Sequence, residues 1–126
     1  GQFLIKFDTW LDRHLLTDKD AADMLYIMEN FYLAYISVKQ PVPNEVQDAS
    51  ENFDLLSGGA RWIACEMREF LTAEHLNFYI KQLQEQIELD ENSPLINAMS
   101  SKCYASDSHQ IIRNALVEMV EILKKG

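Results

Sequence analysis

The chain has 126 residues, 48% of them hydrophobic, and a net charge of −9. This length suits one domain with one core, and four glycines with three prolines are too few for a turn-rich all-β fold. The acidity is concentrated in residues 44–92, where eleven acidic and three basic residues give a net charge of −8. Such a surface repels phosphate, so we expect no nucleic-acid partner and favour a basic protein partner.

Residues 3–16 are predicted to form the first helix. Phe3, Phe7, Leu11 and Leu15 recur at every fourth position. That spacing places all four side chains in one apolar stripe along the helix.

Residues 20–38 are the stretch around which we expect the domain to be organised. Asp23 and Glu29 are the charged residues between positions 21 and 38, and apolar side chains fill most of the rest. A helix that is apolar nearly all round is usually a buried one. Asp23, Glu29 and Asn30 would lie in hydrocarbon if this helix crossed a bilayer, so we predict the central helix of a soluble bundle and no membrane contact.

The following helices are marked by caps and breakers. Thr17 is a candidate N-cap of the central helix, and Pro41 ends it. A helix is predicted over 44–56, with Ser57-Gly58-Gly59 as its C-terminal stop.

Further helices are predicted over residues 60–71, 73–90, 94–101 and 107–125. Thr72 either caps a new helix or lies within a continuous one. The sequence therefore predicts an all-α single domain, residues 1–126, with six or seven helices. We expect its core to contain Phe7, Leu11, Met24, Leu25, Met28, Phe31, Tyr32, Phe53, Ile63, Met67, Phe70, Ile80, Leu83, Ile112, Leu116 and Met119.

The predicted 44–56 helix carries an acidic face. Glu45, Asp48, Glu51 and Asp54 have no basic residue among them. Such a face is either simply solvated or docks a basic partner, with charge steering the encounter. We favour a non-enzymatic interaction or regulatory domain of the inhibitor or immunity type, with these four carboxylates as its partner-binding residues.

Arg68 and His75 suggest an alternative. If one helix runs through Thr72, their seven-residue spacing is almost two turns and places both on one face. The pair resembles the arginine-x(4–6)-histidine motif of HEPN-family ribonucleases, which are small α-helical domains. The resemblance implies metal-independent RNA cleavage with Arg68 and His75 as catalytic residues, at a site that two protomers share. A homodimer is therefore left open.

A third class is an adaptor that holds a partner helix in an apolar groove, as Bcl-2-like bundles do. Trp62, Phe78 and Tyr104 are the candidate groove aromatics. Buried aromatics are far commoner than functional ones, so the same residues also fit an ordinary core.

We expect no metal and no cofactor. His14, His75 and His109 lack a second ligand at helical spacing on the same face, apart from Asp18 near His14 across a predicted helix end. Cys65 and Cys103 have no metal-binding spacing, and we expect both to be reduced and inert. No signal peptide is recognised, so a cytoplasmic location is the default expectation.

Overall fold

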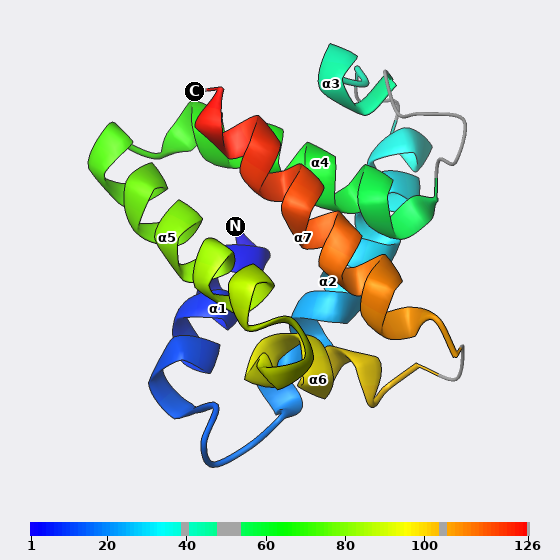
Figure 1. Cartoon of the computed structure of the whole chain (residues 1–126). Coiled ribbons are helices and arrows are strands. Elements are labelled where there is room, and N and C mark those ends of the chain that lie inside the picture. The colour runs from blue at the N-terminus through cyan, green and yellow to red at the C-terminus, as the bar shows by residue number, and fades with distance from the viewer. Residues whose placement is uncertain (39–40, 48–53, 104–105, 126) are drawn as a thin grey trace.

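The computed structural model describes residues 1–38, 41–47, 54–103 and 106–125, and within these ranges all regular structure is helical. The helices pack together as one bundle (Figure 1). This confirms the predicted all-α class. The elements are α1 (Gln2–Arg13), α2 (Lys19–Ser37), α3 (Asn44–Gln47), α4 (Leu55–Phe70), α5 (Ala73–Leu89), η1 (Asp90–Asn92), α6 (Pro94–Ser100) and α7 (Ser108–Lys124).

The predicted helix over 44–56 is wrong in extent. Helix α3 contains four residues, and a separate helix, α4, begins at Leu55. The Asp54 side chain starts α4 by accepting a hydrogen bond from the backbone N–H of Ser57 at 2.8 Å. Ser57, Gly58 and Gly59 consequently lie inside the first turns of α4 and do not end a helix.

Gly59 lies at a close approach of the backbones of α2 and α4. A Cβ atom built on Gly59 would overlap the carbonyl oxygen of Met28 and would lie 3.4 Å from the Cβ of Phe31. A side chain at this position would therefore push α4 away from α2. Close helix packing accounts for this glycine, in place of the predicted C-cap.

Helix α4 is the most enclosed of the long helices, because it packs against α2 and also against α7 (Figure 1). In α2, by contrast, the fully buried residues end at Met28. The second half of α2 leaves Leu33 52% exposed and Ile36 39% exposed. The apolar surface of α2 therefore exceeds what the bundle covers.

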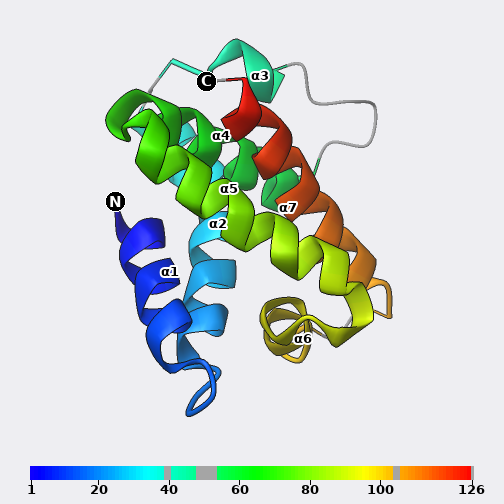
Figure 2. The ribbon, with the colours of Figure 1, turned by 60° about the vertical axis from the view of Figure 1, so that its left-hand side comes forward.

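An ion pair joins the end of α1 to the start of α2, which run side by side in Figure 2. Asp20 is fully buried, and the Arg13 guanidinium donates to both of its carboxylate oxygens, at 2.7 and 3.0 Å. Helix α1 ends at Arg13, so Leu15 lies in the turn that follows and is 89% exposed. The predicted extension of the first helix to residue 16 is therefore wrong.

A polar network joins the end of α5 to α6 and α7. Gln86 and Ser93 are buried and hydrogen-bonded to each other, and Ser93 caps α6 as predicted. Asp90 has a positive φ of 49° and binds His109 and Arg113 of α7, at 3.0 and 3.3 Å.

Most of the predicted core residues are buried, with two kinds of exception. Leu11, Phe31 and Tyr32 are half-buried and pack against the core from its edge. Phe70, the last residue of α4, is 79% exposed, so its predicted burial is wrong. Phe53 lies outside the described residues.

No helix in the described part of the chain combines the length and the hydrophobicity needed to cross a bilayer.

Replacing Gly59 with Ala should destabilise the fold, although Ala is the better helix former by about 1 kcal/mol. The new methyl group meets the backbone of Met28, which cannot rotate away, and overpacking costs about 1–3 kcal/mol. We expect the free energy of unfolding in urea to fall by at least about 1 kcal/mol. Glu85→Ala, at an exposed site of α5, is the control and should stay within about 0.5 kcal/mol of wild type. A more stable Gly59→Ala protein would contradict the close approach.

Asp20 should make the fold sensitive to acid. The hydrogen bond from Arg13 lowers the pKa of Asp20 below its ordinary value of 3.8, against the opposing effect of burial. The stability that the ionised Asp20 contributes to the fold is therefore complete above its ordinary pKa. This stability is lost as the pH falls through the lower pKa of Asp20 in the folded protein. We expect the stability of wild type, measured by urea unfolding at several pH values, to fall below about pH 4. Asp20→Asn should be less stable at pH 7 and should show a smaller loss in acid. Equal losses in the two proteins would exclude this role of Asp20.

Candidate functional site

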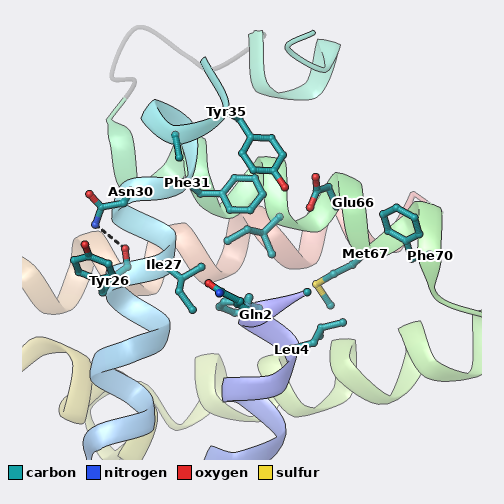
Figure 3. A pocket seen from close by; sticks show the side chains of 14 residues that line it. Gln2, Leu4, Tyr26, Ile27, Asn30, Phe31, Tyr35, Glu66, Met67 and Phe70 are labelled. Carbon is teal, nitrogen blue, oxygen red and sulfur yellow. Dashed lines mark hydrogen bonds between the residues drawn. The ribbon is translucent and has the colours of Figure 1, made fainter. Parts of the chain in front are cut away.

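A pocket among the described residues lies between the start of α1, the middle and second half of α2, and the end of α4. Its volume is about 420 Å³, within the range of ligand-binding sites. Figure 3 shows side chains from the three helices around it. Most of the lining is apolar, including Phe3, Leu4, Ile27, Phe31, Ala34, Ile63 and Met67.

A second hollow of about 340 Å³ continues this pocket along α1 and α2. The two share Gln2, Tyr26 and Ile27 as walls. The second hollow also includes the ion pair of Lys6 and Asp23, whose charged atoms lie 2.9 Å apart. We refer to the two hollows together as the groove.

Exposed apolar side chains form the rim of the groove. Phe70 is 79% exposed, Tyr26 67% and Ile5 64%. Large apolar side chains gathered around a hollow mark a binding surface more often than scattered ones do. The rim therefore has the composition of a contact surface.

Stacked aromatic rings form one wall of the groove. The rings of Phe31 and Tyr35, one helical turn apart in α2, stack with centroids 4.2 Å apart. Behind them, the buried Trp62 of α4 makes edge contacts with both rings, at 6.2 and 5.2 Å. These contacts restrict the rotamers of both side chains, so the wall is already formed before any ligand binds.

Glu66 places a carboxylate beside this aromatic wall. It is half-buried, and the Tyr35 hydroxyl points toward it in Figure 3. Burial raises the pKa of Tyr35, and the hydrogen bond and negative charge of Glu66 raise it further. Among the described residues, no cationic group forms an ion pair with Glu66. The groove therefore combines a mainly apolar lining with a carboxylate that lacks a described cationic partner.

The predicted acidic face does not form one surface among the residues described. Glu45 accepts a hydrogen bond from Arg68 of α4 at 2.7 Å, and this bond lowers the pKa of Glu45. Asp54 caps α4. Both carboxylates therefore have structural partners. Asp48 and Glu51 lie outside the described residues, so their part of the face stays a prediction.

Arg68 and His75 lie on different helices. Helix α4 ends at Phe70, and Thr72 caps α5 by accepting a hydrogen bond from the N–H of His75. The continuous helix on which their shared face depends is therefore not formed. The Arg68 side chain is bound to Glu45 and lies 3.4 Å from the carbonyl oxygen of Ile122, whereas His75 is exposed.

Trp62 and Phe78, two of the candidate groove aromatics, do not line the groove. Trp62 is buried and supports the aromatic wall from behind. Phe78 is 47% exposed on α5 and does not line the groove, and Tyr104 lies outside the described residues.

Two other kinds of group are candidates for a site, namely metal ligands and cysteine thiols. Within the described ranges, no cluster of three or more His, Cys, Asp or Glu side chains could hold a metal ion. Both cysteines are free thiols. Burial, and then the negative charge of Glu45, raise the pKa of Cys65 to about 11.

Comparison of this chain with protein-family models, curated proteins and solved structures found no match.

The residues that distinguish the groove were not selected from the sequence. Tyr35 and Tyr26 belong to the apolar central stretch, Phe70 was expected in the core, and Glu66 had no motif around it. One signal was present: residues 20–38 contain more apolar side chains than one helix face can bury. Such an excess of apolar side chains indicates either that the helix is enclosed on all sides or that part of its apolar surface is exposed.

Cys65 should react slowly in the folded protein, because the thiolate is the nucleophile. Its pKa of about 11 lies two units above the ordinary 9.0, so at pH 8 it should be alkylated by iodoacetamide about a hundredfold more slowly than in the unfolded chain. Mass spectrometry of a Cys103→Ser protein, with and without urea, measures both rates. Equal rates would show that Cys65 is accessible and reactive.

Proposed function

We propose that this chain is a protein-interaction domain that binds an amphipathic helix of a positively charged partner in the groove. The observation that carries the proposal is the groove itself, with exposed Tyr26 and Phe70 at its rim and Glu66 in its wall. An inhibitor or immunity-type role remains compatible with such binding.

The shape of the groove favours a helical ligand. It extends along α1 and α2, and helices form its walls. The described residues offer no strand edge to which an extended peptide could add main-chain hydrogen bonds. An amphipathic helix instead inserts side chains at i, i+3, i+4 and i+7 into an apolar groove and leaves its own backbone bonds intact.

The charge of the chain favours a basic partner over a second copy. The net charge is −9, and α4, which supplies Glu66 and Phe70, belongs to the most acidic part of the sequence. A second copy would bring the same negative charge, whereas a basic partner would be attracted to this surface. The carboxylates of Asp48 and Glu51 would add to this attraction.

Phe70→Ser should weaken binding. Helical peptides displayed on phage, with apolar residues at i, i+3, i+4 and i+7 and randomised flanks, are selected against wild type, and the enriched peptides are synthesised. Phe70→Ser should reduce their affinity by about tenfold or more, because aromatic anchors dominate interfaces. The affinity is measured by fluorescence anisotropy.

Leu15→Ser is the matched control, since Leu15 is also a highly exposed apolar side chain but does not line the groove. The affinity of the Leu15→Ser protein for the peptides should equal that of wild type. Failure to enrich any peptide, or equal losses in the two variants, would refute the groove as the binding site.

A further inference from the structure

We infer that Glu66 binds a lysine or arginine of the partner helix and thereby sets the direction in which that helix lies in the groove. This inference rests on the proposed function and adds to it a specific chemical requirement on the partner.

The first argument is the effect of binding on the Glu66 carboxylate. Glu66 is half-buried before binding, in a lining that is mainly apolar. An apolar helix laid over it would remove its remaining water, and a buried charge without a partner is strongly unfavourable. A partner that places a cationic side chain there avoids this cost. A partner with an apolar or acidic side chain at the same position does not.

The second argument is the orientation of the carboxylate. The Tyr35 hydroxyl points toward the Glu66 carboxylate in Figure 3, and Tyr35 is itself held by stacking on Phe31. A carboxylate has four lone-pair sites on two oxygens, so a hydroxyl on one side of it leaves capacity for an ammonium or guanidinium group.

The third argument is the asymmetry of the groove. In the second hollow, Lys6 and Asp23 form an ion pair and neutralise each other. At the α4 end, Glu66 lacks a cationic partner among the described residues. A bound helix therefore gains a charge interaction at one end of the groove, which distinguishes its two orientations.

Selection of the same peptide library against charge variants tests the inference. Wild type should enrich Lys or Arg at one flank of the apolar stripe. Glu66→Lys should instead enrich Asp or Glu at that flank, and Glu66→Gln, which keeps an acceptor for the Tyr35 hydroxyl, should lose the charge preference. Glu69→Lys makes the same charge change at an exposed site of α4 outside the groove lining and should select like wild type.

Affinities of individual peptides give the second measurement. Exchanging the enriched Lys for Glu should weaken binding to wild type by about tenfold or more, and Glu66→Lys should restore much of the loss. A nitroxide on the basic end of the peptide should broaden amide signals near the end of α4 more than those near Lys6. Circular dichroism confirms that each variant is folded.

The outcomes separate the inference from the proposed function. Peptides that require Phe70 but show the same charge preference with wild type and Glu66→Lys would overturn the role of Glu66 and leave the groove as the binding site. Absence of any enriched peptide would overturn both.

Discussion

The close approach of α2 and α4 at Gly59 is the constraint on which the remaining architecture depends. Because no side chain separates Gly59 from the backbone of Met28, the first half of α2 is buried against α4. Helix α4 also packs on α7, so it connects α2 to α7. Beyond this contact, the aromatic residues of α2 lie at the edge of the core. They form the wall of the groove beside the last turns of α4.

The charged groups of this acidic chain are divided between structural pairs and the groove. Arg13 neutralises the buried Asp20, Arg68 binds Glu45, and Arg61 binds Glu118 at 2.6 Å. These cations hold helix to helix: α1 to α2, α3 to α4, and α4 to α7. Because they are committed to such pairs, none of them neutralises Glu66. The same scarcity of cations that gives the chain its negative charge therefore leaves a carboxylate available for a partner.

The differences from the sequence predictions have local physical causes. The acidic 44–56 segment was expected to be one helix because its apolar residues have helical spacing. The Asp54 side chain instead caps a new helix and places Gly58 and Gly59 inside it. Phe70 fits the apolar stripe of α4 by position, but it is the last residue of that helix, and none of the described elements covers it there. Arg68 and His75 were separated because Thr72 acts as a cap, one of the two alternatives that the sequence left open.

The sequence by itself determined the helical class, most helix positions and most of the core, because helical periodicity and capping are local properties of neighbouring residues. Met24, Met28, Leu83 and Leu116 could be assigned to the interior on that basis. Tertiary structure alone decided which apolar side chains remain uncovered and which carboxylates find cations. Those outcomes depend on contacts between segments far apart in the chain, such as Glu45 with Arg68 and Tyr35 with Glu66. The groove lies between three helices, so it became visible only when α1, α2 and α4 were in place.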